Sequence, residues 1–114
     1  MDIGWLGERI AAEYLRRQGY KLLYQRWRKG SHEIDIIAWD KGELVFVEVR
    51  TVGKHTAWAA EQTIGRHKQA GLRRAIEVFL SENPEYSLLP ARIDVVAVRL
   101  SAPPEVVLLV DAFR

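Results

Sequence analysis

The 114-residue sequence contains no cysteine, which excludes disulfides, zinc–thiolate centres and thiol chemistry. A chain without cysteine suits a reducing compartment, and we expect a cytoplasmic protein. The sequence also lacks any run of roughly 18 apolar residues, the length of a membrane helix. Residues 1–15 have neither a basic flank nor an unbroken apolar segment, so we expect no signal peptide and no membrane partner.

A strong charge of one sign is missing too, because the formal net charge is only +2. The basic residues are instead gathered in short clusters: Arg16 and Arg17; Arg26, Arg28 and Lys29; Lys54 and His55; Arg66, His67 and Lys68; Arg73 and Arg74. Clusters of this kind are typical of a surface that binds nucleic acid. Each cluster alone is also typical of an ordinary solvated face, so the distribution is a weak indication of an anionic partner.

Hydrophobic periodicity predicts one α/β domain over residues 1–114. Helical periodicity covers residues 4–18 and 64–81, and apolar runs predict strands at 20–27, 33–39, 43–49, 91–100 and 106–113. Residues 51–62 are a predicted loop, so the expected order is αβββαββ. The strands at 33–39, 43–49 and 91–100 are apolar on both faces, which predicts a central sheet with a helix on each face.

Two of these apolar strands carry a carboxylate in an otherwise apolar run, Asp35 in "EIDIIAW" and Glu48 in "ELVFVEVR". A two-residue or four-residue turn between the strands would place Asp35 directly opposite Glu48 on one face of the sheet. A three-residue turn would slip the pairing by one residue and put the two carboxylates on opposite faces. The chemistry of the pair therefore depends on this register.

Two like charges facing each other in an apolar sheet are destabilising unless something compensates for them. Three compensations are open. A Mg²⁺ or Mn²⁺ ion could bridge both carboxylates, Arg50 could neutralise them, or one carboxyl could be protonated with a raised pKa. In the alternative interpretation the pair has no chemical role, and both carboxylates simply reach water at the ends of their strands.

The segments "GERIAAEYLRRQGYKLL", "EIDIIA", "VFVEVR", "RHKQAGLRRAIEVFL" and "RIDVVAV" together resemble the YraN-like family. That family is assigned to the PD-(D/E)XK nuclease superfamily, which includes restriction endonucleases and Holliday-junction resolvases. The resemblance covers nearly the whole chain and implies a restriction-endonuclease-like αβββαββ domain with a mixed central sheet. It also implies a metal-dependent endonuclease acting on nucleic acid, DNA in particular, in structured or branched form. Resolvase-like relatives are often dimers, so a homodimer is expected by analogy.

The resemblance assigns site residues as well. Asp35 and Glu48 would be ligands of Mg²⁺ or Mn²⁺, with the backbone carbonyl of Val49 as a third ligand and Glu8 completing the site. Arg50 stands where the superfamily motif has lysine, and Lys68 matches a family position that faces the same cleft. The predicted contacts to nucleic acid are Lys54, His55, Arg66, Lys68 and Arg73.

The sequence departs from the family pattern at His32, where a glycine is expected, and at Arg50. An arginine is always protonated, so Arg50 can clamp a phosphate but cannot act as a general base. This departure motivates a second hypothesis, a nucleic-acid-binding module with weak or lost catalysis. A structural or adaptor protein is a third.

Three further residues outside the assigned catalytic set have expected roles. Glu33 is expected to pair with Arg50 or to serve as a secondary ligand. Asp94 interrupts an apolar strand without a facing acidic residue, which favours a structural hydrogen-bonding role. Trp58 is expected to anchor its loop.

Overall fold

The computed structural model describes residues 3–53 and 64–113. Along the chain it contains α1 (Ile3–Arg17), β1 (Lys21–Lys29), β2 (His32–Asp40), β3 (Glu43–Gly53), α3 (Arg66–Glu82), the 3₁₀ helix η1 (Pro84–Tyr86), β4 (Ala91–Leu100) and β5 (Glu105–Leu109). The predicted order of helices and strands is confirmed. Neither helix in the described ranges combines the length and apolar character that a membrane crossing requires.

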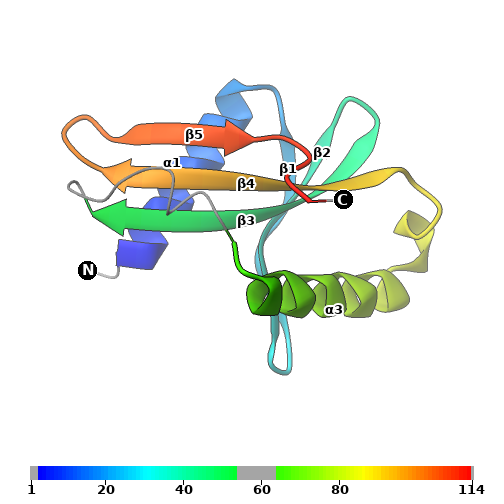
Figure 1. Cartoon of the computed structure of the whole chain (residues 1–114). Helices are drawn as coiled ribbons and strands as arrows, with labels where there is room; N and C mark the ends of the chain where they lie inside the picture. Colours follow the sequence, from blue (N-terminus) through cyan, green and yellow to red (C-terminus); the bar gives the residue numbers. More distant parts are fainter. Residues whose placement is uncertain (1–2, 54–63, 114) are drawn as a thin grey trace.

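The strands form one mixed sheet in the order β1-β2-β3-β4-β5, with β1 and β5 at its edges. Strands β3 and β4 are parallel, with α3 in the crossover between them, and the other neighbouring pairs are antiparallel. The sheet is strongly twisted, so that β1 and β2 run across the direction of β3, β4 and β5 (Figure 1).

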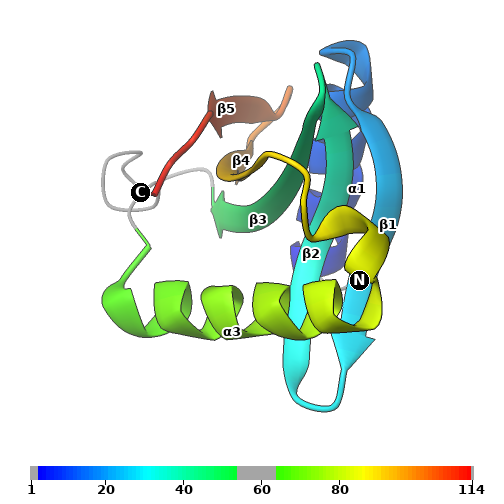
Figure 2. The ribbon, with the colours of Figure 1, turned by 90° about the vertical axis from the view of Figure 1, so that its right-hand side faces the viewer.

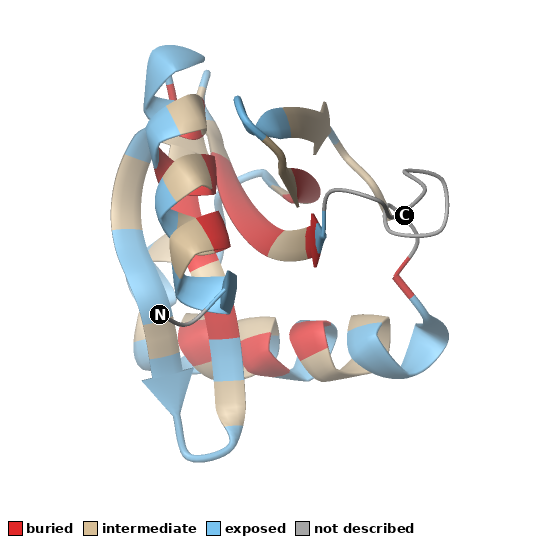
Figure 3. Ribbon diagram, turned by 90° about the vertical axis from the view of Figure 1, so that its left-hand side faces the viewer, coloured by how far each residue is buried: buried red, intermediate tan, exposed pale blue. Residues whose placement is uncertain are grey.

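Two hydrophobic clusters cover the two faces of the sheet, one under each helix. Residues of α1, with Leu15 at the centre, pack on Val45 and Val47 of β3 and on neighbours from β2 and β4. Residues of α3, with Phe79 at the centre, pack on Phe46 of β3 and on Ile34 and Ile37 of β2. The buried positions of α1 accordingly lie on its sheet-facing side (Figure 3), and the prediction of a helix on each face is confirmed.

Two strands end four residues away from their predicted ends, β3 and β5. The strand β3 continues to Gly53, because Thr51 and Val52 pair with Val98 and Arg99 of β4. The sequence pattern placed these residues in a loop. Conversely β5 ends at Leu109 rather than at residue 113, and Asp111 adopts a left-handed φ of 53° just beyond it.

The turn between β2 and β3 resolves the register that the sequence left open. Asp40 pairs with Glu43, which leaves Lys41 and Gly42 as a two-residue turn with φ of 50° and 86°. Positive φ at both central residues is the geometry of a type I′ hairpin turn, which glycine accommodates without strain. The pairing continues to Ile36 with Val47, so the next two residues are Asp35 and Glu48.

A buried polar network surrounds the first half of β4. Asp94 is fully buried and accepts hydrogen bonds from the Tyr20 hydroxyl (2.7 Å), from the Arg92 guanidinium (3.0 Å) and from the backbone N–H of Asp111 (2.9 Å). Arg92 also contacts Asp40 (2.6 Å). Burial, followed by hydrogen bonding to Asp94, raises the pKa of Tyr20. The structural role expected of Asp94 is confirmed.

Candidate metal site and nucleic-acid groove

A pocket of about 460 Å³ opens where α1, the centres of β1 and β2, and the end of β3 meet. Carboxylates dominate its lining, namely Glu8 from α1, Glu33 and Asp35 from β2, and Glu48 from β3. The cationic side chains Arg26, Arg50 and Lys68 also line it. The structure therefore brings together all five residues whose side chains the sequence assigned to catalysis or metal binding: Glu8, Asp35, Glu48, Arg50 and Lys68.

The sheet is irregular at Asp35, and this irregularity aims its side chain into the pocket. Regular pairing of β2 with β3 stops at Ile36, and the Asp35 Oδ2 atom accepts the backbone N–H of Val49 at 2.8 Å. The carboxylate thus replaces the backbone acceptor that β2 would otherwise supply. Ile34 packs under α3 together with Ile37, so the alternation of faces shifts at Asp35.

Glu8, Glu33 and Asp35 each place one carboxylate oxygen within 4.8 Å of the others. Burial, followed by repulsion from Asp35, raises the pKa of Glu8. Burial is also the main cause that raises the pKa of Asp35, against the Val49 hydrogen bond that lowers it. A set of hard carboxylate oxygens with unfavourable mutual repulsion suits Mg²⁺ or Mn²⁺, since a divalent cation would neutralise it.

The position of Glu8 depends on the glycine that precedes it. Gly7 is buried, and a Cβ atom at this position would collide with the side chain of Thr51 on β3. Glycine therefore lets α1 approach the end of β3 more closely than any other residue would. This close approach carries Glu8 to the carboxylates of β2, which gives the "GE" pair of the first helix a physical reason.

Glu48 lies on the α3 side of the pocket and is only 5% exposed. Its Oε1 atom is 3.3 Å from the Nζ atom of Lys68 on α3. Burial raises the pKa of Glu48 to about 7, with a further increase from Asp35 and an opposing effect of Lys68. The charged form of Glu48 is therefore unfavourable in the metal-free protein.

This raised pKa predicts a pH-dependent gain in stability for the variant Glu48→Gln. The folded state binds the Glu48 proton more tightly than the unfolded state, whose pKa is near 4.5, so Glu48 lowers stability as the pH rises from about 4.5 to about 7. Relative to its effect at pH 5, the substitution should raise the free energy of unfolding at pH 8 by on the order of 1–2 kcal/mol.

Urea unfolding in EDTA at both pH values measures this difference, and the exposed variant Glu13→Gln serves as the control. An equal effect of Glu48→Gln at pH 5 and pH 8 would contradict the raised pKa. The comparison uses differences between variants, so titrating groups that do not interact with Glu48 cancel.

Arg26 is a site residue that sequence reasoning missed. The pairs Gln25 with Ile36 and Trp27 with Ile34 place Arg26 opposite Asp35, and its φ of 54° is left-handed. This conformation is uncommon for a residue with a Cβ atom. The Arg26 Nε atom contacts Glu8 Oε2 at 3.0 Å. Only the register of β1, which contains a bulge between Leu22 and Tyr24, reveals this placement.

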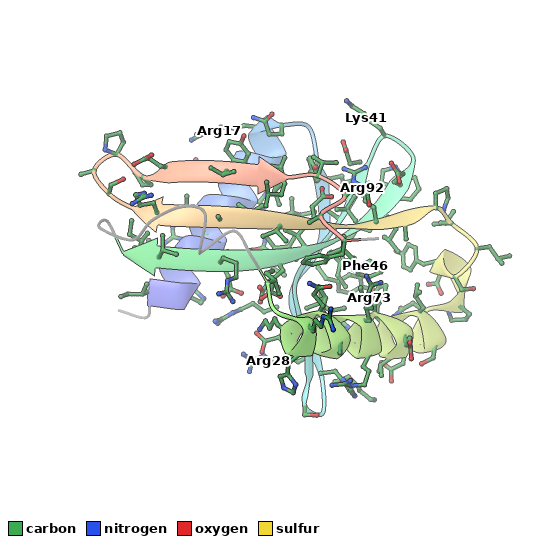
Figure 4. All side chains as sticks on the ribbon, in the orientation of Figure 1. Arg17, Arg28, Lys41, Phe46, Arg73 and Arg92 are labelled. Atoms are coloured by element: carbon green, nitrogen blue, oxygen red, sulfur yellow. The ribbon has the colours of Figure 1, made fainter. Side chains whose placement is uncertain are left out.

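The remaining predicted residues fall into two groups. Arg66 begins α3 and is exposed, whereas Arg73 lines a different pocket, beside Phe46 (Figure 4). Arg73 therefore does not share the carboxylate pocket. Lys54, His55 and Trp58 lie outside the described residues. Glu33 forms an ion pair with Arg28 at 3.6 Å, a partner that the sequence did not indicate.

A mixed five-stranded sheet with a helix on each face and a carboxylate pocket beside its centre define an α/β protein compatible with the restriction-endonuclease-like fold. The chain belongs to the Uncharacterised protein family UPF0102, whose model matches residues 7–98. This is the YraN-like family that the sequence motifs resemble, so that prediction is confirmed.

Several relatives carry the name "UPF0102 protein". The protein from Roseiflexus castenholzii is 43% identical over 96 residues, which cover 84% of this chain and 77% of that protein. The one from Carboxydothermus hydrogenoformans is 37% identical over 97 residues, covering 85% and 81%. The one from Treponema denticola is 36% identical over 123 residues, covering 98% and 95%.

Proposed function

We propose that the protein is a Mg²⁺- or Mn²⁺-dependent endonuclease that hydrolyses phosphodiester bonds of DNA in structured or branched form. The observation that carries this proposal is the convergence of Glu8, Asp35 and Glu48, from three separate elements, on one pocket. The raised pKa values of all three carboxyls support a site that gains from a bound cation.

In this proposal Asp35 and Glu48 hold the metal, with the Val49 carbonyl and Glu8 as further ligands. The metal would activate water and polarise the scissile phosphate. Asp35 also holds the end of β3 through the Val49 N–H, which fixes the spacing between the strands that carry the ligands. Arg50 would bind a phosphate oxygen, since its guanidinium is suited to bidentate contacts with phosphate.

The ammonium of Lys68 supports catalysis despite the arginine at position 50. Lys68 reaches the pocket from α3, and its Nζ atom lies 3.3 Å from Glu48. A lysine can stabilise developing charge on the phosphate as a compact point charge. We propose that Lys68 supplies the ammonium group that the family pattern has at position 50, where this chain has Arg50.

A cleavage assay with Mn²⁺ tests the proposal on branched, single-stranded and blunt duplex DNA. Wild type should cut at least one of these substrates, and Glu48→Gln should lower the rate at least about 100-fold, in the range seen when a group that acts on a metal centre is removed. Urea unfolding of the same variant under the conditions of the assay shows whether unfolding contributes to the loss.

Glu13→Gln is the matched control, because Glu13 lies on the same helix as Glu8 but forms an exposed ion pair with Arg17. Equal cleavage by wild type and Glu48→Gln would refute the metal site. Absence of cleavage together with salt-sensitive DNA binding would favour the second candidate, a binding module on the same fold, which the Arg50 departure motivates.

A further inference from the structure

A second groove continues from the carboxylate pocket along α3. It has a volume of about 300 Å³ and shares the lining residues Glu33, Glu48 and Lys68 with the pocket, so the two hollows adjoin. One wall of the groove is the first half of α3, and the other is the start of β2. The β1–β2 hairpin that forms this second wall projects past α3 (Figure 2).

The exposed cations of this groove favour an anionic ligand. Its two acidic residues are already paired, Glu33 with Arg28 at 3.6 Å and Glu48 with Lys68 at 3.3 Å. Arg74 also lines the groove and is exposed, and it forms no ion pair with any residue in the ranges 3–53 and 64–113. The groove thus presents the guanidinium of Arg74 beside the candidate metal site, where it is available to an anionic ligand.

A glycine in the interior of α3 is the second observation. Gly71 lines the groove, and a Cβ atom built on it would meet nothing closer than the Arg74 guanidinium at 4.0 Å. Its φ is not left-handed, so neither packing nor backbone conformation requires glycine there. Glycine makes a helix interior less stable than alanine does. A glycine leaves the helix backbone without a side chain at one position, and such a position facing a groove is typical of a place where a ligand approaches the backbone closely.

We infer that this groove binds the sugar–phosphate backbone of a single DNA strand next to the scissile phosphate, with Arg74 on a phosphate and Gly71 giving room for its approach. The volume is at the lower end of ligand pockets and suits one strand rather than a duplex. This inference rests on the proposed function and narrows its substrate to DNA with a single-stranded segment.

Two exposed arginines on opposite faces of the sheet supply a matched pair of variants. Arg74→Gln should weaken binding of a fluorescent single-stranded oligonucleotide about 5–10-fold and reduce the slope of log affinity against log salt by about one. Arg17→Gln should change affinity less than about twofold, because Arg17 lies at the end of α1, which packs on the face of the sheet opposite to α3. Equal losses in both variants would overturn the inference.

The variant Gly71→Ala provides an independent test. If the fold required this glycine, alanine would lower the melting temperature, whereas a glycine that only gives room to a ligand can be replaced without loss of stability. We expect the melting temperature to rise by about 2–5 °C, since alanine favours the helix and meets no clash. The affinity for the single strand should nevertheless fall about fivefold or more. A stabilised variant with unchanged affinity would overturn the role of Gly71.

All of these titrations are made in EDTA, so that their outcome is independent of cleavage. Tighter binding of a tailed duplex than of a blunt duplex of the same length supports the inference, and equal affinities would contradict it. If single strands bind as expected but Mn²⁺ gives no cleavage, the proposed function fails and the groove stands. Cleavage with no effect of Arg74→Gln on binding would overturn the groove and leave the proposed function in place.

Discussion

Replacement of Asp35 by asparagine is expected to abolish high-affinity Mn²⁺ binding. Asp35 shares a carboxylate cluster with Glu8 and Glu33 and lines the same pocket as Glu48. Asparagine keeps the shape and retains an oxygen for the Val49 N–H, so the fold should persist. It removes the charge and the basic ligand atom, and the dissociation constant for Mn²⁺ should rise more than about 100-fold.

Isothermal titration with Mn²⁺ measures this effect, and Glu13→Gln on the exposed face of α1 is again the control. Urea unfolding of Asp35→Asn without metal should show a free energy of unfolding equal to or higher than that of wild type, since burial raises the pKa of Asp35. An Mn²⁺ affinity within a factor of about two of wild type would reject Asp35 as a ligand.

Loss of the Asp94 carboxylate should strongly destabilise the core. The variant Asp94→Ala leaves the Tyr20 hydroxyl and the Asp111 N–H without their acceptor. It also removes the fully buried one of the three acidic partners of Arg92, the others being Asp40 and Glu43. Removal of one member of a buried ion pair typically destabilises a protein by about 3–5 kcal/mol. That is a large part of the roughly 5–15 kcal/mol that holds a domain folded.

Urea unfolding of Asp94→Ala beside Glu82→Gln isolates the effect of burial. Glu82 pairs with Lys29 at 2.9 Å, and Asp94 with Arg92 at 3.0 Å, but the Glu82 side chain is 39% exposed and that of Asp94 is not exposed at all. The exposed pair should contribute less than about 1 kcal/mol. Similar losses in both variants would show that the Asp94 network is not what stabilises this end of the sheet.

Because strands alternate with a period of two, the sequence offered Asp35 and Glu48 as a facing pair in one register of the "DKG" turn and on opposite faces in another. What remained open was the turn length, which Lys41 and Gly42 determine through their positive φ values. Glycine often adopts a positive φ, but lysine rarely does, so the residue type at position 41 does not indicate a two-residue turn. Local sequence patterns therefore predict which residues could form a site more readily than they predict the strand register that brings those residues together.

Long-range pairing explains the features that the sequence did not predict. Thr51 and Val52 belong to β3 because β4 lies parallel beside them, although β4 comes much later in the chain. Arg92 meets Asp40 and Tyr20 for the same reason. A short stretch of sequence cannot indicate which residues a later crossover connection will bring beside it. Both the end of β3 and the buried network around Arg92 are therefore seen only in the structure.

The contacts of Arg26 with Glu8 and of Lys68 with Glu48 have a consequence for the order of events at the site. Each of these carboxylates already has a resident cationic partner, so a divalent ion entering the pocket takes part in an exchange of counter-ions. The displaced guanidinium and ammonium groups remain on the walls of the pocket. Metal loading would thereby turn two groups that face carboxylates into two groups available to an incoming anion, and the pocket would bind phosphate more tightly once it is loaded.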